Sequence, residues 1–444
     1  MGTLIMAGQL ILALAILVSL HEWGHYIAAR SFGIRVEKFF IFFDAWGIKL
    51  FSKKVNDTEW GIGWLPLGGY VKISGMIDES LDKEQLASEP EDFEFRSKPA
   101  WQRLIVMIGG VTVNFLLGIL IFALSLWYYG DQWLPASAVN DANGIAATEM
   151  GKDVGFESGD KLLSVNGEKL DRFRDYSNPK LWLGEELTYQ VERDGSQKEV
   201  TIDEAARTKV LESKGNSFFS ARVSTRVAKP AKDAKEAGIE EGDLILAVNN
   251  ASTQFVDQLY DVLEEVKGQK VNLSVLRGAD TLSISKEVDT TGKLGVYLDD
   301  KFEFKDKIET TKFGFMESFP EGTKRGMETL VLNVKAFGQM FAGKLNPVKT
   351  VSGPFQIAAI YGSSWNWQRF WQITGMLSFI LAFMNLLPIP ALDGGHVLFL
   401  LIEMLRGKPL PEKVMYYFQV VGMIILFALM AFILFVDGWN TLFN

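Results

Sequence analysis

Cysteine is absent from this chain of 444 residues, which excludes disulfides and thiolate metal ligands. Any metal must therefore be held by histidine, aspartate or glutamate. Histidine is also scarce, since only His21, His25 and His396 occur. Two of these three lie within one five-residue stretch, an arrangement that is hard to attribute to chance. The lack of cysteine fits either side of a membrane, so it leaves the redox compartment open.

An excess of positive charge is missing as well. The net charge of −9 argues against nucleic acid as the main partner. Residues 1–9 contain no lysine or arginine, so the basic start of a signal peptide is lacking. The apolar run that begins near Thr3 is long enough to cross a bilayer, which takes about 20 residues. We therefore expect a retained transmembrane helix over residues 1–31.

The motif His21-Glu22-x-x-His25 lies in the second half of this predicted helix. Four residues make about one helical turn, so both imidazoles face the same side and can occupy two corners of a tetrahedral zinc site. Glu22 lies between them and can act as the base of a metal-assisted hydrolysis. A structural or transported metal is the alternative, although transport would not need the glutamate. The motif's location predicts hydrolysis inside the membrane.

A third zinc ligand is expected from a broken helix near the C-terminus. A predicted span from about Phe370 runs into two prolines and two glycines within residues 385–396. Such backbone is tolerated at membrane depth only if it is buried in protein or lines a wet cavity. Asp393 and His396 could each complete the site. We favour Asp393, because a carboxylate there needs a cation more than a neutral imidazole does.

An internal repeat occupies the middle of the chain. Residues Gly155–Asn166 match Gly238–Asn249, and each copy predicts a turn, a buried strand and an asparagine turn, followed by a hairpin. Both copies resemble PDZ domains, which often bind a peptide as an added strand. The alternative is that they are spacers or gates that bind no peptide.

The chain thus predicts a multi-pass α-helical membrane protein with about four transmembrane helices, a membrane-associated β-hairpin or sheet, and two tandem PDZ-like domains. Aromatic residues suggest that the sheet touches the bilayer interface, although an ordinary sheet is the alternative. The helical stretch 317–342 would lie on the membrane surface or in a packed core.

The expected segments are transmembrane helix 1 at 1–31, the β region at 32–76, an acidic linker or surface helix at 77–100, transmembrane helix 2 at 101–130, PDZ-like domains at 131–222 and 223–305, amphipathic helices and a loop at 306–369, transmembrane helix 3 at 370–396, an inner loop at 397–413 and transmembrane helix 4 at 414–436.

Basic residues indicate the orientation of these spans. Lysine and arginine follow span one, precede span two and fill the loop between spans three and four, whereas both chain ends lack them. The positive-inside rule then places the ends and the repeats outside and the β region inside. Asn114 in span two should face the bundle interior, because an asparagine in lipid needs a partner. The small residues Gly109 and Gly110 should allow close helix packing.

These motifs together resemble the site-2 proteases, in particular the bacterial RseP-like branch with two tandem PDZ domains. The resemblance runs nearly end to end and rests on four elements: His21-Glu22-x-x-His25, Asn385-x-x-Pro388-x-Pro390-x-Leu392-Asp393-Gly394-Gly395, Pro66-Leu67-Gly68-Gly69-Tyr70-Val71-Lys72 and Gly109-Gly110-x-x-x-Asn114.

This resemblance implies that Asp393 is the third ligand of Zn²⁺. It also implies that Asn385, Pro388 and Pro390 help to hold the substrate. The β region is implied to be a membrane-re-entrant element whose edge, near Gly69 and Tyr70, pairs with the substrate backbone.

One departure from the family pattern follows the first predicted strand. The family often has a Gly-x-Gly element there, whereas this chain has Phe42-Phe43-Asp44. Whatever those glycines do cannot be transferred to this chain.

The sequence thus predicts an intramembrane zinc endopeptidase of a bacterial inner membrane, with its active site toward the cytoplasmic side and its PDZ-like domains on the periplasmic side. Its expected partners are the lipid bilayer and single-span substrates already trimmed outside, such as anti-sigma factors and remnant signal peptides, with the PDZ-like domains acting as a size filter. A monomer is a plausible state. A non-catalytic zinc-containing membrane scaffold is the alternative function, and a metal transporter is the third.

Overall fold

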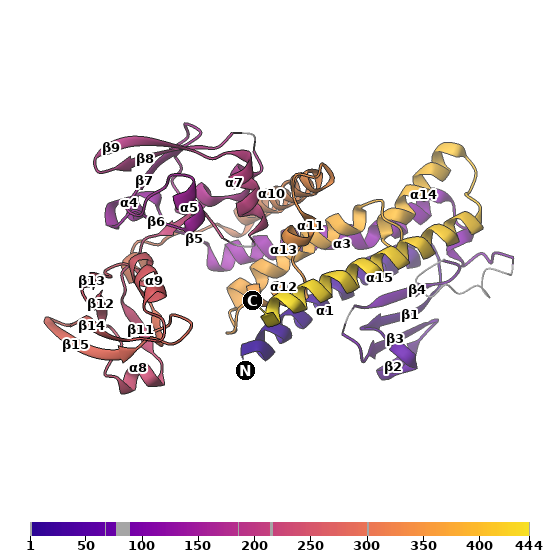
Figure 1. The fold of residues 1–444 in the computed structure, drawn as a ribbon. Coiled ribbons are helices and arrows are strands. Elements are labelled where there is room, and N and C mark those ends of the chain that lie inside the picture. The colour runs from indigo at the N-terminus through magenta and orange to yellow at the C-terminus, as the bar shows by residue number, and fades with distance from the viewer. Residues whose placement is uncertain are drawn as a thin grey trace. The chain divides into compact units, whose positions relative to one another are not determined.

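The computed structural model describes residues 2–66, 68–76, 89–184, 186–213, 216–299 and 302–443. The first half of the acidic linker expected at 77–100, residues 77–88, lies outside the described residues. The chain divides into two compact units (Figure 1). One unit comprises Met1–Gly130, Lys312–Gly338 and Val351–Asn444, and the other comprises Asp131–Thr311 and Gln339–Thr350.

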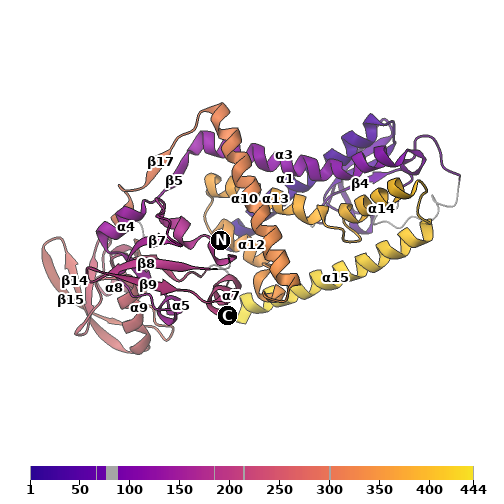
Figure 2. The same ribbon diagram turned by 90° about the horizontal axis from the view of Figure 1, so that it is seen from above.

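Long helices form the core of the first unit. Among the helices of the described residues, three are long and apolar enough to cross a membrane: α1 (Gly2–Ser31), α3 (Ala100–Tyr129) and α15 (Glu412–Phe443), the last over Lys413–Gly438. About four such helices were expected. The helix α13 (Trp367–Leu386), which lies where the third span was expected, is not among them. It lies along α3 (Figure 2) with polar groups turned inward, and its buried Ser378 hydroxyl donates to the Asn114 carbonyl at 2.7 Å.

Small residues let α1 and α3 approach closely. A Cβ atom on Gly24 would collide with the backbone of Gly109, and one on Gly109 would lie 2.7 Å from the Gly24 carbonyl oxygen. The packing role expected for the α3 glycines is therefore confirmed. Because neither helix has a side chain at this contact, the backbone of α3 comes beside the histidine motif.

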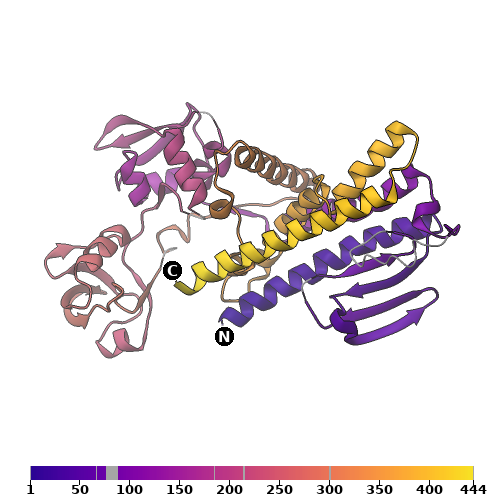
Figure 3. The same ribbon diagram turned by 45° about the vertical axis from the view of Figure 1, so that its right-hand side comes forward.

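A four-stranded sheet follows α1 and lies along its second half (Figure 3). Its strands are β1 (Val36–Ile41), β2 (Lys49–Val55), β3 (Thr58–Gly63) and β4 (Tyr70–Ile73), in the order β2-β3-β1-β4. The β1–β3 pair is parallel and the others are antiparallel. A Cβ atom on Gly69 would lie 3.5 Å from the Val18 side chain. The chain entering β4 therefore returns to the middle of α1, and β4 is an edge of the described sheet.

The broken element links α13 to α14 (Asp393–Arg406). A Cβ atom on Gly394 would collide with the Leu387 carbonyl, and one on Gly422 of α15 would collide with Pro390. Ala391 has a positive φ of 72°, and its amide donates to the buried Gln419 of α15 at 3.3 Å. This irregular backbone is thus packed against α15 and the start of α14, while the side chains of Leu386 and Pro388 are exposed.

Two further helices belong to the first unit: α10 (Phe315–Phe341), whose last residues belong to the other unit, and the short α12 (Pro354–Tyr361). The buried residues of α10 are Ser318, Gly322 and Gly326, and a Cβ atom on Gly322 would lie 2.8 Å from the Ala123 amide nitrogen of α3. Its apolar side chains Met327, Val331 and Val334 are exposed. The packed-core alternative is therefore wrong for these three residues.

The second unit contains two hydrophobic cores, one for each repeat copy. In both copies a buried aspartate pairs with an arginine that also donates to a glycine carbonyl: Arg193 binds Asp160 and Gly155, and Arg277 binds Asp243 and Gly238. The sequence repeat is thus also a structural repeat. Its sheets are β7 (Lys161–Val165), β8 (Thr188–Arg193) and β9 (Ser196–Thr201), and β13 (Ala251–Ser252), β12 (Leu244–Val248), β14 (Lys270–Arg277) and β15 (Asp280–Glu287).

Short elements complete these two cores. Three two-stranded pairs join β5 (Asp131–Trp133) to β17 (Glu309–Thr311), β6 (Ile145–Ala147) to β10 (Phe219–Ala221), and β11 (Val227–Pro230) to β16 (Val296–Leu298). The helices are α4 (Ala136–Ala142), α5 (Glu149–Asp153), α6 (Pro179–Trp182), α7 (Glu204–Glu212), α8 (Lys232–Glu236), α9 (Val256–Glu265) and α11 (Pro347–Thr350).

Candidate metal centre

The two histidines of α1 face one another as their spacing predicts. Both side chains are buried, and their Nε2 atoms lie 3.1 Å apart. Successive turns of α1 bring them to one side, and α3 passes directly beside them. A Cβ atom on Gly110 would collide with the His25 ring, so only glycine leaves room for the imidazoles at this crossing.

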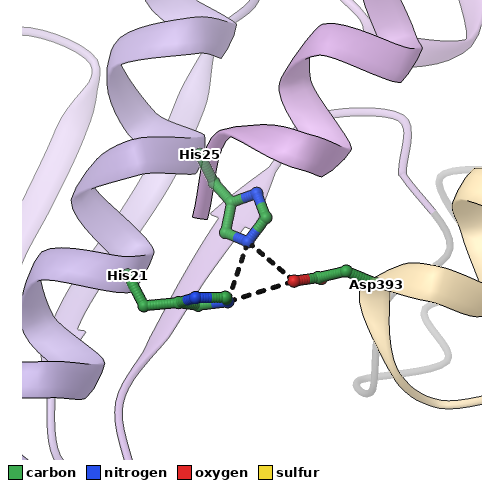
Figure 4. A group of neighbouring side chains, drawn as sticks. All are labelled: His21, His25 and Asp393. Atoms are coloured by element: carbon green, nitrogen blue, oxygen red, sulfur yellow. Dashed lines mark hydrogen bonds and ion pairs between the residues drawn. The ribbon is translucent and has the colours of Figure 1, made fainter. Parts of the chain in front are cut away.

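Asp393 approaches the same point from the other end of the chain (Figure 4). Its Oδ2 atom lies 3.1 Å from Nε2 of His21 and 3.3 Å from Nε2 of His25. Asp393 is the first residue of α14, so the packed turn before it determines where the carboxylate lies. Within the described part of the chain, these three residues form the one group of histidine and acidic side chains that could hold a metal ion.

The arrangement fits Zn²⁺. A tetrahedral zinc ion with bonds of about 2.0–2.1 Å would keep its ligand atoms roughly 3.3 Å apart, close to the separations given above. The Oδ2 atom of Asp393 is buried and accepts no hydrogen bond from the described residues. Three possible ligand atoms thus converge on one point from three side chains, and two imidazoles with a carboxylate suit zinc.

Hydrogen bonds orient both imidazoles. The Nδ1 atom of His25 lies 2.8 Å from the carbonyl oxygen of Val106, so it must carry the proton, which leaves Nε2 free to bind a metal. The Nδ1 atom of His21 lies 3.2 Å from the side-chain amide of Asn114. Asn114 was expected only to face the bundle interior. Its contact with His21 could not be derived from the sequence, although an asparagine in a span is a signal of such a role.

Glu22 lies beside the metal group but is not part of it. The side chain is partly buried, and it interacts electrostatically with His21, His25 and Asp393. The backbone amide of Val71 in β4 also acts electrostatically on its carboxylate. An acceptor group thus stands next to the metal group and beside the sheet.

The five residues expected to bind substrate lie in three different places. The Nδ2 atom of Asn385 lies 3.3 Å from Nε2 of His21, at the edge of the metal group. Pro388 and Pro390 lie in the turn before Asp393. Tyr70 is the first residue of β4 and Gly69 immediately precedes it, and the Tyr70 hydroxyl donates to Asp44 at 2.8 Å.

His396, the other ligand candidate, is not among the three residues of the described metal group. It is partly exposed and lies three residues beyond Asp393, in the first turn of α14. The geometry of the described residues therefore favours the carboxylate over this imidazole.

Comparison with known proteins agrees with this chemistry. Residues 9–429 match the family described as peptidase family M50. A protein of Neisseria meningitidis serogroup A that is named a zinc metalloprotease is 30% identical, over 96% of this chain and 97% of its own. The protein named Regulator of sigma E protease of Haemophilus influenzae is 29% identical, over 97% and 98%. A Pasteurella multocida protein, also named a zinc metalloprotease, is 30% identical over 96% and 97%.

Proposed function

The chain belongs to peptidase family M50 and is a zinc metalloprotease with membrane-spanning helices, and we propose that it cleaves single-span membrane proteins within the bilayer. The observation that carries this proposal is the group of His21, His25 and Asp393. Two of its members lie on a helix that is long and apolar enough to cross a membrane. Peptide bonds reach such a site only from within the membrane or from its surface.

His21, His25 and Asp393 would hold the zinc ion, which supplies Lewis acidity toward the scissile carbonyl and the attacking water. Glu22 accepts a proton from that water and delivers it to the leaving amine. Its place between the two histidines, with the Val71 amide acting electrostatically on the carboxylate, supports this role. Asn385 offers an amide donor beside His21, where it can bind the substrate backbone.

The edge of β4 is the proposed docking place for substrate. A helical substrate hides its peptide bonds in its own hydrogen bonds and must be unwound before cleavage. Pairing the unwound segment with a strand edge keeps it extended. The edge begins at Gly69, where a Cβ atom would lie 2.6 Å from the Phe40 carbonyl oxygen, so a side chain there would disturb the sheet. Pro388 and Pro390, which have no amide hydrogen, would border the substrate on the side of α14.

The repeat copies are proposed to be PDZ domains that limit the size of what reaches the site. Charge near the spans supports placing them on the periplasmic side of an inner membrane, with the metal centre toward the cytoplasm. The relative named Regulator of sigma E protease supports anti-sigma factors as substrates. Remnant signal peptides share the required form, a single apolar span with a short outer end.

Zinc content and cleavage by the purified full chain test the proposal. We expect a chelator to stop cleavage of a model single-span peptide and added Zn²⁺ to restore it. Asp393→Ala should lose zinc and activity together, whereas His396→Ala should keep its zinc. Normal zinc in Asp393→Ala with loss in His396→Ala would reverse the ligand assignment. Zinc binding by a wild-type chain that cleaves no peptide would favour the scaffold instead.

A further inference from the structure

The segment 42–44, where this chain departs from the Gly-x-Gly pattern, has an unusual backbone. Up to Ile41, β1 pairs in parallel with β3. Phe42 then takes a positive φ of 68°, and Phe43 pairs in the antiparallel sense with Leu65, each amide donating to the other's carbonyl at 3.2 Å. A bulky residue with positive φ is strained. The strained conformation of Phe42 persists because the strand pairing before it and the pairing of Phe43 after it fix the backbone.

This segment contacts Tyr70 through the ring of Phe43 and the carboxylate of Asp44. The Tyr70 ring stacks on Phe43, with planes 9° apart, and on Phe40, with planes 14° apart. The Tyr70 hydroxyl donates to Oδ1 of Asp44 at 2.8 Å. The other oxygen, Oδ2, lies 3.5 Å from the Lys38 ammonium, and only 15% of the Asp44 side chain is exposed. Asp44 is thus a mostly buried carboxylate with a partner on each oxygen.

The position of Tyr70 affects both the strand edge proposed to bind substrate and the neighbourhood of Glu22. It is the first residue of β4, the strand edge proposed to receive substrate. The backbone amide of the next residue, Val71, acts electrostatically on Glu22. A shift at the start of β4 would therefore move the pairing edge relative to the metal group.

We propose that Asp44 is a positioning residue that holds Tyr70 and so fixes the register in which a substrate strand pairs with β4. This inference rests on the proposed function. It assigns the 42–44 segment a part in substrate binding and in the choice of the scissile bond. Asp44 itself touches neither the metal group nor, in this account, the substrate.

Kinetics on a single-span peptide provide the first test. Asp44→Ala should raise KM about tenfold, equivalent to ~1.4 kcal/mol, with a smaller change in kcat and an unchanged zinc content. Mass spectrometry should show cleavage spread over neighbouring bonds. Tyr70→Phe should behave alike, and the double variant should be no worse than either single one, because both remove the same contact. Asp44→Asn keeps an acceptor for the hydroxyl and should restore a single cleavage position.

A matched control comes from the same sheet. Asp57 lies in the exposed turn between β2 and β3, with 61% of its side chain exposed, and Asp57→Ala should leave KM and the cleavage position unchanged. An equal loss in this variant would show that any lost carboxylate disturbs the sheet, and it would overturn the specific role of Asp44.

Disulfide cross-linking tests the register of substrate pairing without requiring catalysis. The chain has no cysteine of its own that would compete with the introduced ones. In a Glu22→Gln background, Lys72→Cys on β4 should form a disulfide with one or two positions of a substrate scanned by single cysteines. Adding Asp44→Ala should broaden that pattern. An unchanged pattern together with unchanged KM would overturn the inference even if the wild type cleaves normally. Failure of the wild type to cleave, with a narrow pattern that Asp44→Ala broadens, would instead contradict only the proposed function.

Discussion

Replacing Asn114 should weaken zinc binding although this residue is not one of the three proposed ligands. Its side chain is buried, with 1% exposed, and its amide is the one described partner of His21 Nδ1, at 3.2 Å. For Nε2 to bind a metal, Nδ1 must carry the proton, and the side-chain oxygen of Asn114 must then face Nδ1 to accept it. Asn114→Ala leaves a buried N–H without an acceptor, which costs about 1–3 kcal/mol.

That cost predicts a zinc affinity reduced roughly 10- to 100-fold, as is typical when such supporting partners are removed. The assay is competition with a chelator of known affinity on the purified full chain, read as bound zinc per protein. Thr112→Ala is a matched control, because Thr112 is exposed two residues away on α3 and its hydroxyl bonds only its own helix. An Asn114→Ala protein with wild-type zinc affinity would refute the reasoning about His21.

Three further predictions follow from packing and charge. Gly110→Ala should abolish zinc binding, because the added methyl collides with the imidazoles; bound zinc measured by mass spectrometry tests this. Asp437→Ala should destabilise the chain by about 0.5–2 kcal/mol, because its carboxylate accepts from the first amides of α12; thermal unfolding in detergent tests this. Burial alone would raise the pKa of Asp243, but hydrogen bonds from Arg277 hold this pKa below its ordinary value. The stabilisation is therefore complete above about pH 4 and lost as pH falls through the folded-state pKa, which hydrogen exchange of β12 and β14 in wild type and Asp243→Asn should show.

Features that depend on residue spacing along a helix, or on prolines and glycines that interrupt one, could be predicted from the sequence. The four-residue spacing of His21 and His25 places both rings on one side of any helix, and they do face one another. The prolines and glycines before Asp393 require an interrupted helix, which the structure has between α13 and α14. These features depend on local geometry, so the sequence alone suffices.

Contacts between distant segments could not be predicted in this way. The Val106 carbonyl that orients His25 is a backbone group, and no residue type indicates it. The pair of Asp44 and Tyr70 depends on how a loop folds back over a sheet. The expected count of about four spans is not confirmed for a related reason. The described helix α13 is not among the three candidate spans, and one side of it is buried and carries polar groups such as Ser378.

The most direct test of the central claim is cleavage of a single-span peptide by wild type and Glu22→Gln, both loaded with one zinc ion. The control is Glu328→Gln, a substitution of an exposed residue of α10, which should cleave the peptide as the wild type does. Glu22→Gln should retain zinc and lose cleavage, because its three metal ligands remain but the water has no base. A fully active, zinc-loaded Glu22→Gln protein would contradict this role of Glu22.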